Sequence, residues 1–199
     1  MMKQTQVKLA LLAAISLIVW TGQSLAVAAG MSAAQSPLKE DPGKADSPEI
    51  SRAIAVLHPT QGQKVQGTIA FTQTPEGVHV KAEVSHLPSG SHAYHVHLYG
   101  DCSGPQGKTA GTHFNFQGSS KAPPDNIDRI TGNLGNLEAD AEGNATAETV
   151  LEQATLHGPY TIIGRSVVVH AKPNDPSSPP MGAAGSRLAC GVIGIDETL

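Results

Sequence analysis

Short runs rich in apolar and β-branched residues recur along the chain from residue 52 onward. Eight of them are found, over residues 52–57, 65–71, 78–84, 93–99, 134–139, 145–151, 165–170 and 189–195. Their length is typical of β-strands, and segments rich in Gly, Pro, Asn and Asp separate them. No long amphipathic helical pattern is present. The chain is therefore predicted to form an all-β sandwich or barrel with eight strands.

Two connections between the expected strands, over residues 100–131 and 171–187, are far longer than a hairpin requires. Long loops without their own secondary structure are uncommon in compact domains and usually carry function. Each of these two loops begins directly after a histidine-bearing strand. We therefore expect a functional site beneath them.

The N-terminal residues follow a different pattern. Lys3 and Lys8 precede an apolar run over residues 9–20, and small residues follow up to Ala29. A basic start, a short apolar run and an A-x-A-like site are typical of a secretory signal peptide, which we place at residues 1–28. The run is shorter than a membrane span requires, and an uncleaved anchor is the alternative.

Residues 29–50 mix Ser, Pro, Ala and charged residues without an apolar period. Such a segment buries too little apolar surface to offset its ordering entropy, so we expect a flexible linker. Residues 51–199 then form one domain that is long enough for its own core.

The charge balance narrows the possible partners. The formal net charge is −4, and removal of the two signal-peptide lysines would make it about −6. An acidic chain is a poor match for nucleic acid or for an anionic membrane surface. A small anionic substrate remains possible, because local fields decide its binding.

Histidines provide the strongest chemical signal. His95 and His97 are separated by one residue, so on a strand they point to the same side, about 6–7 Å apart. His113 and His170 occur at two other positions beside β-prone sequence. Chance placement among the nine histidines is the alternative interpretation, but this grouping favours a metal site. The opposite side of the same strand is expected to face the core and carries His92, Tyr94, Val96 and Leu98.

The chain has two cysteines, Cys102 and Cys190. In an exported protein, a single pair most simply forms one disulfide, which would fasten the first long loop to the last strand. A thiolate metal pair is the weaker alternative, because neither cysteine has a neighbouring Cys or His.

Five motifs together resemble those of the copper/zinc superoxide dismutase family. They are HVHLYGD at 95–101, GTHFN at 111–115, GNLGN at 132–136, IGRSVVVH at 163–170 and GSRLACGVIG at 185–194. The resemblance extends from about residue 53 to residue 195. It implies an eight-stranded antiparallel Greek-key barrel, with the metal site on its outer face under the two long loops.

The resemblance also implies roles for individual residues. The copper ligands would be His95, His97, His113 and His170. Four neutral imidazoles suit Cu(II). Arg187 matches the arginine that attracts and orients superoxide, and a surface charge or loop anchor is the alternative. Cys102 and Cys190 match the intrasubunit disulfide, and His92 matches a histidine that forms hydrogen bonds below the site.

The positions of the family's zinc ligands differ in this chain. Apart from the bridging histidine, they hold Lys121, Ile130 and Asn133, none of which is a competent zinc ligand. The aspartate that normally links the surroundings of the two metals is replaced by Asn174, and Met181 stands where a channel-lining threonine is common. We therefore predict a copper-only site and regard zinc as doubtful.

Two further ideas concern the residues around the missing zinc. Lys121 would place a positive charge near the zinc position, with a solvated surface lysine as the alternative. Asp125 or Asp128 would orient His113 by accepting a hydrogen bond, although exposed loop aspartates are the simpler interpretation.

The resulting hypothesis is a copper-dependent superoxide dismutase in which Arg187 and His113 are the catalytic residues. His113 would carry a proton to the reduced product. A copper-binding or copper-buffering protein with little turnover is the alternative, and a scaffold that reuses the barrel is the weakest. The signal peptide and disulfide favour export, to a bacterial periplasm above all. The sequence leaves open whether the protein is a monomer or a homodimer.

Overall fold

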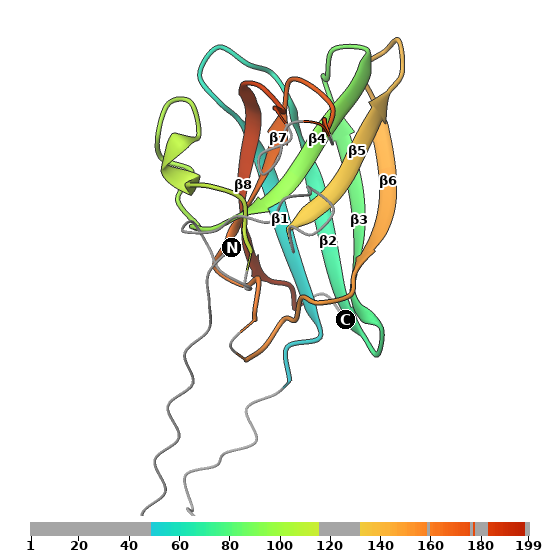
Figure 1. The fold of residues 1–199 in the computed structure, drawn as a ribbon, viewed down its shortest axis with the longest axis vertical. Coiled ribbons are helices and arrows are strands. Elements are labelled where there is room, and N and C mark those ends of the chain that lie inside the picture. Colours follow the sequence, from blue (N-terminus) through green and yellow to red (C-terminus); the bar gives the residue numbers. More distant parts are fainter. Residues whose placement is uncertain (1–48, 116–131, 159, 176, 178–182, 198–199) are drawn as a thin grey trace, which may run out of the picture. The chain divides into compact units, whose positions relative to one another are not determined.

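The computed structural model of the chain describes residues 49–115, 132–158, 160–175, 177 and 183–197. Eight strands and one short 3₁₀ helix, η1 (Lys108–Ala110), lie within them (Figure 1). The strands are β1 (Arg52–Pro59), β2 (Gln66–Thr74), β3 (Gly77–Ser85), β4 (Gly90–His97), β5 (Asn133–Ala139), β6 (Ala145–Leu151), β7 (Ser166–His170) and β8 (Arg187–Ile195). Every predicted strand is present, with ends displaced by a few residues. The sequence pattern gave no signal for η1.

The eight strands pair in the order β5-β4-β7-β8-β1-β2-β3-β6, and every pairing is antiparallel. The two strands at the ends of this order, β5 and β6, follow each other in the chain. A tight turn joins them, in which the Asp140 N–H donates to the Asn144 carbonyl at 2.9 Å. The sheet therefore curves into a nearly closed barrel (Figure 1). Pairings such as β4 with β7 and β1 with β8 are Greek-key crossovers, as predicted.

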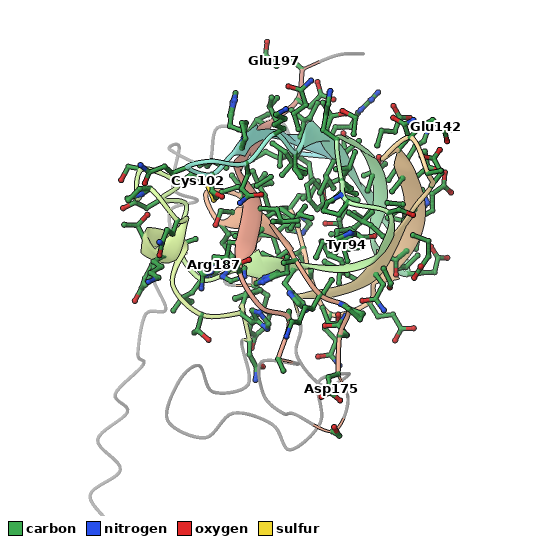
Figure 2. The ribbon with its side chains drawn as sticks, turned by 90° about the horizontal axis from the view of Figure 1, so that it is seen from above. Tyr94, Cys102, Glu142, Asp175, Arg187 and Glu197 are labelled. Carbon is green, nitrogen blue, oxygen red and sulfur yellow. A yellow bond between two sulfur atoms is a disulfide. The ribbon has the colours of Figure 1, made fainter. Side chains whose placement is uncertain are left out.

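Alternation of buried and exposed side chains builds the core. In β1, Ala53, Ala55 and Leu57 are buried, whereas Val56 between them is exposed. Because the pleat sends every second side chain inward, each strand contributes one row to the interior. Figure 2 looks down the barrel and shows Tyr94 of β4 inside the ring of strands.

This alternation is lost most completely in two strands. All five residues of β7 are buried, and the last six residues of β4 are buried as well. In β4, Tyr94 and Val96 belong to the core, whereas His95 and His97 point to the outer side and yet have no exposed surface. Other parts of the chain must therefore cover the outer side of β4.

The expected signal peptide and almost all of the expected linker lie outside the described residues. No helix among the residues that the structure describes is long and apolar enough to cross a membrane.

Candidate metal centre

Four histidine side chains converge on the outer side of β4. One ligand nitrogen from each of His95, His97, His113 and His170 lies within 4.8 Å of the corresponding atoms of the other three. All four side chains are buried. In the part of the chain that the structure describes, this is the one group of three or more His, Cys, Asp or Glu residues that could hold a metal ion. The structure thus brings together the four histidines singled out in the sequence.

Strand pairing places these four side chains. His95 and His97 share a side of β4, and β7 pairs with β4 and ends in His170. His113 is brought in by a short bridge to His97. On either side of that bridge, the Leu98 N–H donates to the Thr112 carbonyl and the Phe114 N–H donates to the Val96 carbonyl, both at 2.8 Å.

Gly132 allows a third segment to close over this bridge. Its N–H donates to the Phe114 carbonyl at 3.0 Å, and its carbonyl accepts from the Val96 N–H at 2.8 Å. A Cβ atom at this position would lie 2.5 Å from the Val96 carbonyl oxygen, which is shorter than any tolerated contact. A glycine is therefore required here for the backbone to approach β4.

Hydrogen bonds to acceptor oxygens fix the tautomers of two ligands. Nδ1 of His97 lies 3.0 Å from the Gly111 carbonyl oxygen, so it carries the proton and Nε2 keeps a lone pair. Nε2 of His95 lies 2.7 Å from the side-chain oxygen of Asn174, so here Nδ1 keeps the lone pair. Nε2 of His97 lies 3.2 Å from Nε2 of His170, so both face the same space.

Several buried ring nitrogens have no hydrogen-bond partner among the described residues. They are the Nδ1 atoms of His95, His113 and His170. Unpaired buried polar atoms are rare in folded proteins, since each costs free energy. A metal ion would satisfy such lone pairs, and an all-nitrogen donor set suits copper better than magnesium or calcium. The residues present therefore fit a copper ion.

Burial keeps these histidines neutral. It lowers the pKa of His95 to about 4 and that of His170 to about 3, and it also lowers the pKa values of His97 and His113. The nearby charge of Arg187 adds to this effect on His97, His113 and His170. Neutral imidazoles have the free lone pairs that metal binding requires.

Arg187 begins β8 opposite His170 in the strand register. Its Nη1 donates to the Gly107 carbonyl at 2.5 Å, and its Nη2 donates to the Gly111 carbonyl at 2.6 Å. The Gly111 carbonyl thus accepts hydrogen bonds from both Arg187 and His97. Figure 2 shows Arg187 on the barrel wall. The loop-anchor interpretation of Arg187 therefore holds, and it is compatible with a role toward an anion.

The predicted disulfide between Cys102 and Cys190 is present, with Cα atoms 5.7 Å apart. Cys190 and Val168 are register partners and form a small cluster with Ala110, against which Cys102 packs. The disulfide fastens the loop after β4 to β8, three residues from Arg187. It therefore holds in place the loop whose carbonyls orient Arg187 and His97.

His92 lies below the cluster and forms hydrogen bonds, as expected. It is buried, with Nδ1 2.9 Å from the His170 carbonyl oxygen and Nε2 2.8 Å from the Pro88 carbonyl oxygen. Both ring nitrogens face backbone carbonyls, to one of which a neutral ring can donate, so His92 contacts the backbone of a ligand and is not itself a member of the cluster.

The residues expected around a zinc ion divide into two groups. Lys121, Ile130, Asp125, Asp128 and Met181 lie outside the described residues. Asn133 and Asn174 are described, and they form a hydrogen bond to each other at 3.1 Å. The sequence identified them only as lost acidic residues. Their mutual contact had no signal in the sequence.

Comparisons with known proteins agree with this geometry. The family described as copper/zinc superoxide dismutase (SODC) matches residues 65–193. A protein of Caenorhabditis elegans named extracellular superoxide dismutase [Cu-Zn] is 39% identical over 159 residues, covering 75% of this chain and 72% of that protein. A crystal structure of the clock protein EA4 superposes with a TM-score of 0.64 at 41% identity, covering 74% of this chain and 96% of the other.

Proposed function

Because the chain belongs to the copper/zinc superoxide dismutase family, we propose that it converts superoxide to oxygen and hydrogen peroxide with copper alone, without a normal zinc site. The observation that carries the proposal is the buried cluster of four neutral imidazoles with unpaired nitrogens. Copper, when bound, supplies one-electron redox chemistry. Overall, two superoxide ions and two protons yield one molecule of oxygen and one of hydrogen peroxide.

We assign substrate attraction to Arg187. Its guanidinium is held beside the cluster by two carbonyls, which use two of its five N–H groups and leave others for an anion. A fixed positive charge in a partly buried place raises the local concentration of an anionic substrate. Superoxide is the small anion on which enzymes of this family act.

We assign proton delivery to His113. It lies on a loop, whereas the other three cluster histidines lie on strands. Its ring is neutral, because burial lowers its pKa. A neutral imidazole on a loop can take up a proton at a ring nitrogen and transfer it to the reduced product.

The absence of zinc is supported by the surroundings of Asn133. Its side-chain oxygen already accepts from the Gly135 N–H at 3.0 Å and from Asn174 at 3.1 Å. An amide oxygen has two acceptor lone pairs, and both are used. The residue types Lys and Ile at 121 and 130 supply no replacement ligand.

We propose that the mature protein, beginning after about residue 28, is exported, and that a bacterial periplasm is its location. The signal-like N-terminus supports this, as does the relative whose name includes "extracellular". The disulfide also requires an oxidising compartment.

The test is elemental analysis and superoxide turnover on the mature protein refolded with both copper and zinc. We expect one copper per chain, no stoichiometric zinc, and turnover that falls about 10-fold or more in Arg187→Ala, since electrostatic steering is of that order. Arg52→Ala is the matched control, because Arg52 is exposed and lies 3.6 Å from Asp196.

Other results would change the proposal. Stoichiometric zinc would contradict the copper-only site. One copper per chain with negligible turnover would favour a copper-buffering protein, which the altered zinc surroundings also allow.

A further inference from the structure

Two asparagines connect the histidine cluster to the neighbouring strand. Asn133 of β5 is the direct register partner of His95 on β4. Asn174 lies four residues after the end of β7 and contacts both of them. Its Oδ1 is 2.7 Å from Nε2 of His95, and its Nδ2 is 3.1 Å from Oδ1 of Asn133. We call this pair, Asn133 and Asn174, the amide strut.

The backbone fixes the direction of each hydrogen bond in the amide strut. The Gly135 N–H donates to the Asn133 Oδ1 at 3.0 Å, so that atom is an acceptor. The Asn174 Nδ2 must then donate to it, and it also donates to the Gly135 carbonyl at 2.9 Å. A rotated Asn174 amide would place its oxygen against two acceptors. Its oxygen therefore faces His95, whose Nε2 must carry the proton.

A further contact holds Asn174 in place. Its backbone N–H donates to the side-chain oxygen of Asn136 at 2.9 Å. The segment after β7 is therefore attached to β5 through both its backbone and a side chain. Asn174 approaches His95 from a fixed position.

We infer that the amide strut positions His95 for copper and replaces zinc in organising this end of the site. This inference rests on the proposed copper-only function. A carboxylate at position 174 could accept from His95, but it could not donate to the Asn133 oxygen or the Gly135 carbonyl, so these acceptors would lose their donor. The neutral amide satisfies all of them without an ion. It also leaves Nδ1 of His95 as the only free lone pair of that ring.

The two asparagines differ in a way that can be tested. In its hydrogen bonds to Gly135 and Asn174, the Asn133 side chain uses its oxygen as an acceptor, which an aspartate can also provide. Asn174 acts as a donor and an acceptor at once, which an aspartate cannot do. Asn133→Asp should therefore preserve the strut, whereas Asn174→Leu, which offers neither a donor nor an acceptor, should break it.

The primary measurement is the tautomer of His95 in the metal-free protein, read from the ¹⁵N shifts of its ring. We expect a single tautomer with the proton on Nε2 in the wild type and in Asn133→Asp, and a mixture in Asn174→Leu and Asn133→Leu. Because no copper is present, this result is independent of turnover and of metal content. A failed dismutase assay would therefore leave it intact.

The second measurement is copper affinity by competition with a chelator in zinc-free buffer. Loss of a residue that orients a metal ligand typically weakens binding about 10–100-fold, which we expect for Asn174→Leu and Asn133→Leu. Asn133→Asp should bind copper no more weakly than the wild type. Asn133→Leu tests the strut without altering the side chain that forms the hydrogen bond to His95, should Asn174→Leu fail to fold.

Two results would overturn the inference. One is an unchanged tautomer together with unchanged copper affinity in Asn174→Leu and Asn133→Leu at unchanged thermal stability. The other is a loss of thermal stability in these variants with neither the tautomer nor the affinity altered, since that would indicate a merely structural contact.

Discussion

His95 and His97 are two residues apart on the same strand, yet the protein holds them by different means. The Nδ1–H of His97 donates to a backbone carbonyl, that of Gly111, in the disulfide-fastened loop after β4. The Nε2–H of His95 donates to a side-chain amide, that of Asn174, in the segment after β7. His97 consequently offers Nε2, and His95 offers Nδ1, to the space between the two rings.

The difference shows which half of the site can change by substitution. A backbone carbonyl remains whatever side chain its residue carries, so the hold on His97 depends on the path of the loop. A side-chain amide can be replaced in one step, so the hold on His95 depends on residue identity. The half of the site held by side chains is the half that contains Asn133 and Asn174.

Removing the disulfide should produce the largest effect, and it should act on the His97 side. We expect Cys102→Ala combined with Cys190→Ala to lower the free energy of unfolding by about 2–5 kcal/mol. Chemical denaturation of the metal-free protein measures this. The His97 tautomer should become mixed while that of His95 remains single, because the amide strut does not involve this loop. Equal loss of order in both rings would contradict the comparison.

Acid should destabilise the metal-free protein through both rings. The folded-state pKa of His95 is about 4, below the ordinary value of 6.5, so the unfolded chain binds more protons between these values. The contribution of His95 to the free energy of unfolding is therefore fully present above about pH 6.5, and it is lost as the pH decreases toward 4. For His95 alone the loss is about 3 kcal/mol at about 1.4 kcal/mol per pH unit.

Denaturation at several pH values measures this loss. His95→Asn is the matched variant. Its unfolding should take up one proton fewer over the same pH interval, so its free energy of unfolding should depend less steeply on pH. A stability that is independent of pH between 6.5 and 4 would contradict the prediction.

Gly111→Ala should produce the smallest effect and act on the His97 side alone. Gly111 has φ +76°, and an added Cβ would lie 2.7 Å from the ring of Tyr99. Gly164 has nearly the same φ, +77°, with nothing within 4 Å of an added Cβ. Both alanine variants incur backbone strain of about 1–3 kcal/mol, and only in Gly111→Ala does the strain fall on the residue whose carbonyl accepts from His97 and Arg187.

Comparing the unfolding free energies and copper affinities of these two variants separates strain from displacement. We expect weaker copper binding in Gly111→Ala and unchanged binding in Gly164→Ala. Similar copper affinities in both variants would show that the carbonyl position does not matter.

Local pattern was sufficient to predict the strands of this protein. A period of two residues places His95 and His97 on one side of β4 and Tyr94 and Val96 on the other, as the structure has them. Strand ends differed by a few residues, because hydrogen bonds to neighbouring strands decide where a strand stops. The helix η1 was missed because three residues carry no periodic signal.

The wider site required more than local pattern. The placement of His113 and His170 beside β-prone sequence indicated that they join His95 and His97 in a metal site, and the family resemblance assigned all four to copper. The resemblance also marked Asn133 and Asn174 as departures from a zinc site, but not as partners of each other. They are 41 residues apart in the chain and meet because the segment after β7 reaches β5.

The sequence by itself determined the eight strands, the side of β4 that carries the two histidines, and the residue types available as ligands. Those properties depend on neighbours along the chain. The tertiary structure decided which nitrogen each ring presents, which carbonyls hold Arg187, and what the two asparagines do. Each of these depends on contacts between segments that only the barrel brings together, with hydrogen-bond directions set by groups distant in the sequence.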